Sequence, residues 1–162
     1  MIKVVAAAVF AALVLASGAS AGTIAVGGVS VTVPSGWVSV KPAPDPSIQQ
    51  ASPLLVVGTT GAAPRKPHCP VAAYTVPAHG AVVVVLRWSA AEGSKNTGRG
   101  PLAKLVGVKP APFQCFAGRG AYAAVALGGR LYQVNVMVGD KASTAQIAQA
   151  LAVARSFDLT HA

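Results

Sequence analysis

The sequence predicts an α+β domain, an antiparallel sheet with a C-terminal helix packed on it in an α-β-α sandwich-like arrangement. Residues 81–88 include four consecutive valines, which are β-branched and disfavour a helix. Two strand-like segments flank Gly128-Gly129, a pair that supplies the positive φ angles of a tight antiparallel turn. Apolar residues at helical spacing follow Ser143. Together these patterns predict a sheet followed by one amphipathic helix.

The first 21 residues have the features of a signal peptide. Lys3 precedes an uncharged apolar run over residues 4–15, and Ala19-Ser20-Ala21 fits the Ala-x-Ala cleavage pattern. The run is about a dozen residues long, whereas a bilayer-spanning helix needs roughly twenty. We therefore expect a signal peptide at 1–21, cleaved near Ala21, and a secreted or periplasmic, envelope-associated domain at 22–162. An uncut, membrane-tethered protein is the alternative, and sequencing the mature N-terminus would distinguish the two.

The N-terminal half of the domain contains short strand signals separated by proline. Residues 28–33 alternate apolar and polar side chains, which is typical of a half-buried strand. A turn at 34–36 leads into a second short strand at 37–40. Four prolines make 41–53 a loop, and the apolar run at 54–58 predicts a buried strand.

The valine-rich segment 81–88 is expected at the centre of the sheet. Its continuous apolarity indicates that both of its faces are covered. A long polar, glycine-rich stretch follows at 89–101, and we expect a further short strand at 102–108.

The hairpin is the clearest local signal in the chain. Segments 120–127 and 130–138 are joined by the two-residue Gly-Gly loop. The second strand has one apolar face and one mixed face, and the mixed face either lines a cleft or is simply the less buried side. The apolar face carries Tyr132, Val134, Val136 and Val138, and the mixed face carries Leu131, Gln133, Asn135 and Met137.

The C-terminal helix has a recognisable start and an apolar stripe. Ser143 and Gln146 form a capping box, in which the hydroxyl and the amide satisfy open backbone N–H groups. The stripe, expected to pack on the sheet, consists of Ile147, Ala150, Leu151, Ala154 and Phe157.

The domain is strongly basic. Removing Lys3 with the leader leaves 12 basic residues against 4 acidic ones, a formal charge of +8. Such a charge favours contact with anionic surfaces such as lipid headgroups, envelope polymers or acidic proteins, and it also keeps an apolar-rich protein soluble. The basic residues are scattered, so we expect no specific nucleic-acid site.

Cys69 and Cys115 are the two cysteines of the chain, and export would place them in an oxidising compartment. We therefore predict a disulfide that closes a loop of about 47 residues and stabilises the fold by roughly 4 kcal/mol. A metal site that uses these cysteines with His68 and His79 is the alternative. Its spacing fits no standard zinc pattern, so we expect no metal and no cofactor.

Catalytic patterns are sparse. The mature domain has four acidic residues in separate segments and no Gly-x-Ser-x-Gly motif. The alternative that remains is an envelope hydrolase whose cleft combines His79 with Asp140 or Glu92. Trp37 and Trp88 neighbour strand residues, which favours core or sheet-edge positions over a carbohydrate-binding platform.

Both ends of the domain resemble a known family. The segment Val33-Pro34-Ser35-Gly36-Trp37 is similar to the opening of the PsbP/Mog1-like domains of small secreted bacterial proteins. Residues 129–134, followed by a helix that closes on 154–157, resemble the way those domains end. The resemblance implies a single α-β-α sandwich over most of 23–160 and a leaning toward protein binding, without catalytic residues to carry over.

The sequence thus predicts a small exported, non-enzymatic binding or accessory module. We expect its partner to be a protein or an anionic envelope polymer, and we expect no stable membrane anchor. The sequence leaves the oligomeric state open. The expected contact surface is basic, and it comprises Arg65, Lys66, Lys95 and Arg99.

Overall fold

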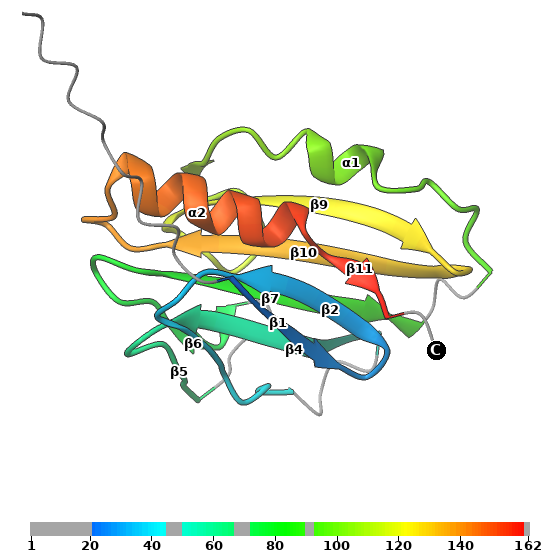
Figure 1. Cartoon of the computed structure of the whole chain (residues 1–162), viewed down its shortest axis with the longest axis horizontal. Coiled ribbons are helices and arrows are strands. Elements are labelled where there is room, and N and C mark those ends of the chain that lie inside the picture. The colour runs from blue at the N-terminus through cyan, green and yellow to red at the C-terminus, as the bar shows by residue number, and fades with distance from the viewer. Residues whose placement is uncertain (1–20, 45–49, 67–71, 90–92, 161–162) are drawn as a thin grey trace, which may run out of the picture.

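The computed structural model describes residues 21–44, 50–66, 72–89 and 93–160, and its centre is a six-stranded antiparallel sheet (Figure 1). The strand order is β3-β4-β7-β10-β9-β8. The strands are β3 (Trp37–Ser39), β4 (Ala51–Thr59), β7 (Ala81–Trp88), β8 (Lys109–Pro110), β9 (Arg119–Leu127) and β10 (Arg130–Val138).

Two smaller sheets and two helices complete the described chain. The smaller sheets are β1 (Gly22–Val26), β2 (Val29–Val33) and β11 (Asp158–Leu159), and β5 (Ala63–Pro64) with β6 (Tyr74–Thr75). The helices are α1 (Gly100–Ala103) and α2 (Thr144–Arg155). The domain is therefore α+β, with an antiparallel sheet and a C-terminal helix, as the sequence predicts. No helix of the described segments has the length and apolarity needed to cross a membrane.

The valine-rich strand β7 lies in the interior of the sheet, between β4 and β10. Each of its first six residues has at most 1% of its surface exposed. Val83 and Val85 belong to the apolar cluster on one face, and Val82 and Val84 belong to the cluster on the other. Both faces of this strand are covered, which confirms the expectation from its unbroken apolarity.

The hairpin β9–β10 is also confirmed. Arg130 pairs with Leu127 across the turn, and Gly128 and Gly129 have φ angles of 57° and 73°. An L side chain is strained in this left-handed region, so glycine is the favoured residue at both positions.

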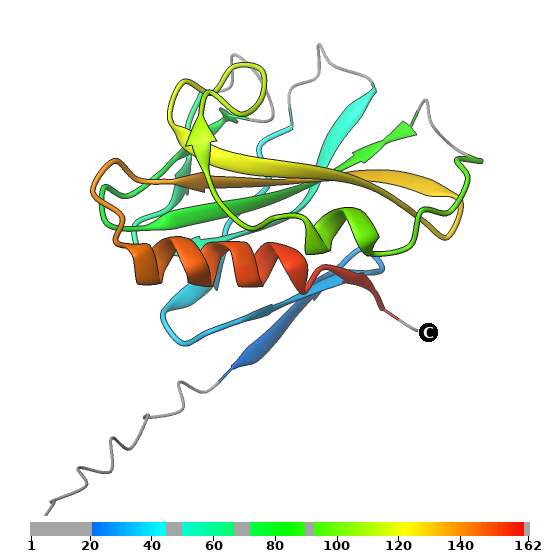
Figure 2. The same cartoon turned by 90° about the horizontal axis from the view of Figure 1, so that it is seen from above.

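We call the side of the central sheet that faces α2 the helix face (Figure 2). The C-terminal helix α2 contacts β7, β10 and β2, and α1 contacts β9. Ser143 and Gln146 form the predicted capping box, with bonds of 3.3 Å and 2.8 Å. Phe157, just past the helix, is fully buried and its ring centroid lies 5.3 Å from that of Tyr132. The predicted apolar stripe therefore packs on the sheet.

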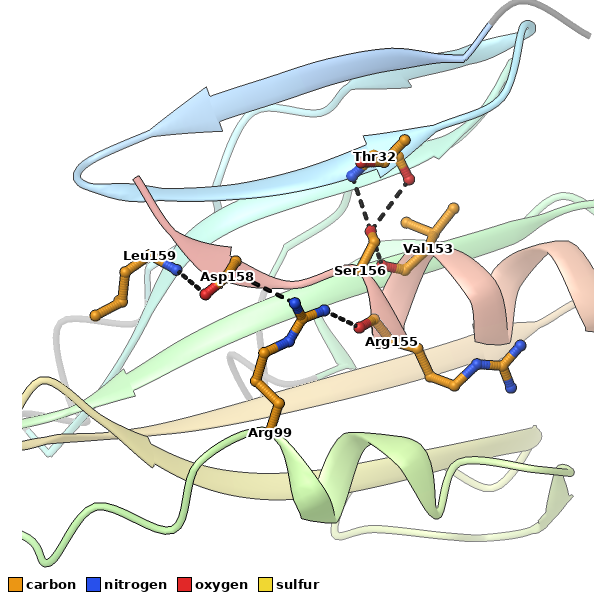
Figure 3. A network of polar contacts seen from close by, with 7 residues as sticks. All are labelled: Thr32, Arg99, Val153, Arg155, Ser156, Asp158 and Leu159. Atoms are coloured by element: carbon orange, nitrogen blue, oxygen red, sulfur yellow. Dashed lines mark hydrogen bonds and ion pairs between the residues drawn. The ribbon is translucent and has the colours of Figure 1, made fainter. Parts of the chain in front are cut away.

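Ser156 attaches the three-stranded sheet, through β2, to the end of α2 (Figure 3). Its Oγ accepts a 2.8 Å bond from the N–H of Thr32 on β2 and donates to the carbonyl of Val153, 2.7 Å away. These bonds satisfy polar groups at the helix C-terminus, where the last carbonyls have no partner within the helix.

We call the opposite side of the sheet the open face. It is covered by loop residues and by the β5–β6 pair rather than by a helix of the described chain. Val82, Val84 and Met137 lie on it, beneath Val40, Ala73 and Tyr74. Phe113 and Phe116 extend this cover toward β9 and β10.

Tyr74 gives the open face a testable pH dependence. The phenol is 2% exposed and its oxygen accepts a 2.9 Å bond from the N–H of Ala43. Burial raises the pKa of Tyr74 above its usual value of 10.0, and the bond from Ala43 acts in the opposite direction. The folded protein therefore holds the proton of Tyr74 more tightly than the unfolded chain does. The contribution of the neutral, buried phenol to the free energy of unfolding is complete below about pH 10 and is lost as the pH rises through the folded pKa.

We therefore expect the free energy of unfolding to fall above pH 10, less steeply in Tyr74→Phe than in wild type. Urea titrations between pH 8 and 11.5 measure this difference. Tyr122→Phe is the matched control, because Tyr122 is 47% exposed. Equal pH slopes for wild type and Tyr74→Phe would contradict the assignment.

Some boundaries differ from the predictions. Strand β4 begins at Ala51 and includes Pro53, which the sequence places in a loop. The pairing with β7 shifts register between Pro53 and Leu55, and proline is tolerated at such an irregularity. The prediction of a strand at 102–108 is wrong, because a short helix with Pro101 at its start occupies 100–103.

Candidate functional site

A cleft on the open face brings together side chains from four parts of the chain. Its volume is about 220 Å³. Trp88 lies at the end of β7, Tyr122 on β9 and Gln133 on β10, and the loop 111–118 supplies the other two residues. The lining residues are Trp88, Phe113, Gln114, Tyr122 and Gln133. None of these five side chains carries a charge at neutral pH.

Strand register explains why Tyr122 lies beside the polar residues of β10. Tyr122 pairs with Asn135. Ala126 lies four residues after Tyr122 on the same strand, and its N–H and carbonyl both bond to Thr97. The backbone polar groups of Ala126 therefore face away from β10. By the alternation of an antiparallel ladder, Tyr122 and Asn135 form a non-hydrogen-bonded pair, in which the Cα atoms are about 4.5 Å apart and the side chains are closest.

The rings of the cleft are fixed by one another. The centroids of Phe113 and Phe116 are 5.2 Å apart with nearly parallel planes, 14° from each other. Phe113 also meets Tyr122 edge to face, with a centroid distance of 6.3 Å and an angle of 87°. Tyr122 is nevertheless 47% exposed, and Trp88 is half-buried. The cleft therefore offers aromatic surface that is held in place but remains accessible.

Strand β10 contributes two amides to the polar part of the site. The Nε2 group of Gln133 donates a 2.9 Å bond to the Oδ1 atom of Asn135. Asn135 is 0% exposed, and its Nδ2 group has no hydrogen-bond partner in the described part of the chain. A buried donor without a partner costs about 1–3 kcal/mol. Such a cost, beside a cleft, points to a functional role for Asn135.

The loop 111–118 forms one wall of the cleft and is tightly built. The N–H of Ala111 donates to the carbonyl of Gly118, 2.9 Å away. A Cβ atom at Gly118 would lie 2.7 Å from the ring of Phe116, and one at Gly120 would lie 2.1 Å from the carbonyl oxygen of Val136. The Gly118-Arg119-Gly120 segment is therefore explained by close packing.

Ala111 and Cys115 in this loop adopt positive φ angles of 42° and 66°. Such a conformation costs a non-glycine residue about 1–3 kcal/mol and persists where the surroundings enforce it. Cys69 lies outside the described residues, so its predicted disulfide with Cys115 stays a prediction. His68 lies outside them as well.

The four basic residues predicted to form a binding surface do not form one group. Arg65 and Lys66 directly follow β5, which lies on the β4 side of the molecule, whereas Lys95 and Arg99 precede α1, which packs on β9 (Figure 1). The guanidinium of Arg65 donates two bonds to the carbonyl of Ala72, at 3.0 Å and 2.7 Å. Lys66 and Lys95 are exposed.

Arg99 joins the polar loop to the end of α2 (Figure 3). Its Nη1 group lies 2.9 Å from the Oδ2 atom of Asp158, and its Nη2 group donates to the carbonyl of Arg155, 2.7 Å away. Arg155 in turn donates a 2.7 Å bond to the carbonyl of Leu105. These contacts tie the segment around α1 to the C-terminus of α2. An exposed pair of this kind contributes at most about 1 kcal/mol.

The hydrolase alternative has little geometric support. The Nδ1 atom of His79 lies 3.1 Å from the carbonyl of Lys141, and the carbonyl of His79 accepts a bond from the amide of Gln146. No hydrogen bond or ion pair joins His79 to Asp140 within the described segments. Glu92 lies outside those segments. Among the residues that the structure describes, no group of three or more His, Cys, Asp or Glu side chains could hold a metal ion.

The sequence indicated part of the cleft. The mixed face of β10, with Gln133 and Asn135, was the signal that could be read from alternation. Phe113, Gln114 and Tyr122 carry no such signal, because their positions depend on the loop 111–118 and on the register of β9. Trp37 is a buried core residue, as expected, whereas Trp88 borders the cleft.

No protein-family model matches this chain, and neither the curated proteins nor the solved structures compared with it give a significant match. The resemblance to PsbP/Mog1-like domains therefore stays a prediction. The functional argument depends on the cleft itself.

Proposed function

We propose that this protein is a small exported, non-enzymatic binding or accessory module of the cell envelope or extracellular space, and that the open-face cleft holds its ligand. The observation that supports this most is the fully buried amide of Asn135, whose Nδ2 group lacks a partner in the described chain beside a cleft lined by rings and amides. Aromatic surface with a few fixed polar groups is the usual composition of a ligand site.

The chemistry of the lining favours binding over catalysis. A hydrolase needs a nucleophile, or a general acid and base, within hydrogen-bond reach of the bond that it cleaves. The five lining residues supply three aromatic rings and two neutral amides. The hydroxyl of Tyr122 can both donate and accept a hydrogen bond, which suits the binding of a polar ligand group.

The basic residues have a secondary role in this proposal. Lys66 and Lys95 are exposed, and the net positive charge supports attraction to an anionic protein or envelope polymer over long distances. Arg99 is less suited to this role, because its guanidinium is engaged by Asp158 and Arg155. Electrostatic attraction would therefore increase the rate at which the protein meets a charged partner, while the cleft determines which ligand binds.

Two structural predictions belong to the same proposal. An α-β-α sandwich has helices on both faces of its sheet, whereas both described helices cover the helix face. The sandwich-like arrangement therefore stays a prediction. The Cys69–Cys115 disulfide would anchor the loop 111–118, which carries Phe113 and Gln114. An anchored loop would keep this wall of the cleft in place before the ligand arrives.

Fragment binding to Tyr122→Ala tests the proposal. A library of small uncharged compounds is screened by ligand-detected NMR against purified wild-type protein. We expect hits whose affinity falls at least about tenfold in Tyr122→Ala, because the variant loses the exposed stacking surface. Val38→Ala is the control, since Val38 on β3 is 46% exposed and lies outside the cleft. An absence of hits, or hits that Tyr122→Ala does not affect, would overturn the assignment of the cleft.

A further inference from the structure

The geometry points to a neutral sugar unit of a glycan chain as the ligand of the open-face cleft. This inference rests on the proposed binding function and specifies the chemical class of the ligand. It follows from the rings, the amides, the size of the cleft and a second hollow beside it.

The ring arrangement suits a pyranose. Three aromatic side chains border the cleft, and Tyr122 is 47% exposed with its ring set at 87° to that of Phe113. An aromatic face is an apolar surface with a partial negative charge, and the C–H groups on one side of a sugar ring match it. Phe113 is held by its stack on Phe116, so binding would cost little side-chain ordering.

The amides suit hydroxyl groups rather than charged groups. Gln133 uses Nε2 toward Asn135, which leaves its Oε1 as an acceptor, and Gln114 is an exposed amide on the same cleft. Amides both donate and accept, as sugar hydroxyls do. A charged ligand would instead need an opposite charge among the five lining residues, and none is present.

The bond from Gln133 to Asn135 fixes the orientation of the Gln133 amide. Asn135 is thus a positioning residue, because it is fully buried and acts through Gln133. Its Nδ2 group, which has no partner among the described residues, leaves a buried donor next to the Gln133 amide.

The size and surroundings of the cleft fit one unit of a chain. A volume of about 220 Å³ is below the roughly 300–1,000 Å³ that is usual for drug-sized ligands. Tyr122 also lines a second hollow of about 340 Å³, formed with Ala121 and residues 104–109. A chain that occupies the cleft could therefore continue past Tyr122 along the edge of β9.

Titration with defined oligosaccharides tests the inference. Short neutral oligomers of glucose, mannose and N-acetylglucosamine are added to purified protein and followed by calorimetry. We expect at least one trisaccharide to bind about tenfold more tightly than its monosaccharide, with less than about a twofold change in affinity between 50 and 500 mM NaCl. Tyr122→Ala and Gln133→Ala should each weaken binding about tenfold or more. Gln149→Ala, an exposed amide on α2, is the matched control for Gln133→Ala.

Three outcomes would overturn the inference. The first is that no neutral sugar binds while fragments still bind at Tyr122, which would leave the proposed binding function intact. The second is that only acidic oligosaccharides bind and that salt abolishes their binding. The third is that a proline-rich peptide, whose class docks on aromatic grooves, binds through Tyr122 and Gln133 while sugars do not.

Discussion

Replacement of both Cys69 and Cys115 by serine is expected to lower the free energy of unfolding by roughly 4 kcal/mol. In the chain-entropy model, a link across about 47 residues removes that much conformational freedom from the unfolded chain. The expected loss is a large share of the stability of a domain of this size, which is typically about 5–15 kcal/mol. Urea unfolding of wild type and of the double variant measures the difference.

The same change should also loosen the wall of the cleft. Cys115 has a φ of 66° in the loop that carries Phe113 and Gln114. Without the proposed link, we expect hydrogen exchange across 111–118 to accelerate and fragment affinity to fall. A variant with Ser35→Ala, at an exposed position in the turn that precedes β3, serves as a comparison for a surface change outside the cleft. Equal stability of wild type and the double variant, with two reactive thiols in the exported protein, would refute the disulfide.

Substitution of Asn135 by leucine is expected to have opposite effects on stability and binding. The variant removes a fully buried amide whose Nδ2 group has no partner in the described chain, and it places an apolar side chain among Val84, Met137 and Tyr122. We expect the free energy of unfolding to rise by about 1–2 kcal/mol. Half-buried Gln133 loses its partner but can bond to water.

Binding should weaken about tenfold or more in Asn135→Leu, because the Gln133 amide is no longer held in one orientation. A residue with a purely structural role would not give a more stable protein that binds less well. Asn135→Val is the second variant, in case leucine overfills the site. Asn96→Leu, at an exposed asparagine whose Oδ1 accepts from Gly98, is the control and should change neither quantity appreciably. Unchanged binding by the two Asn135 variants would contradict the role assigned to Asn135.

Local sequence patterns predicted the parts of the fold that depend on local physics. The Gly128-Gly129 turn, the Ser143 capping box and the buried valines of β7 are each determined by a few adjacent residues. The pairs of β9 and β10 then follow from the turn, because a two-residue loop fixes the register of a hairpin.

The remaining elements depend on partners that are distant in the sequence. Pro53 argues against a strand locally, yet β4 accommodates it at an irregularity of its pairing with β7. Arg99 reads as an exposed binding residue, but Asp158, 59 positions later, pairs with it. No local pattern in the polar loop could indicate that contact.

The cleft shows the same division. Alternation along β10 placed Gln133 and Asn135, the two amides that β10 contributes to the site, on a mixed face. Trp88, Phe113 and Tyr122 meet there because β7 and β9 flank β10 and because the loop 111–118 folds over the sheet. The basic composition instead predicted a binding surface of charged residues. Their long-range effect on the rate of association with a partner does not depend on the cleft.

Mapping of backbone amide resonances during ligand titration tests the central claim most directly. Labelled protein is titrated with the best fragment or oligosaccharide while two-dimensional NMR spectra are recorded. We expect the largest shifts at Trp88, in the loop 111–118, and at Tyr122 and Gln133, with little change around Lys66 and Lys95. Shifts concentrated at the basic residues, with those of the cleft unchanged, would contradict the account.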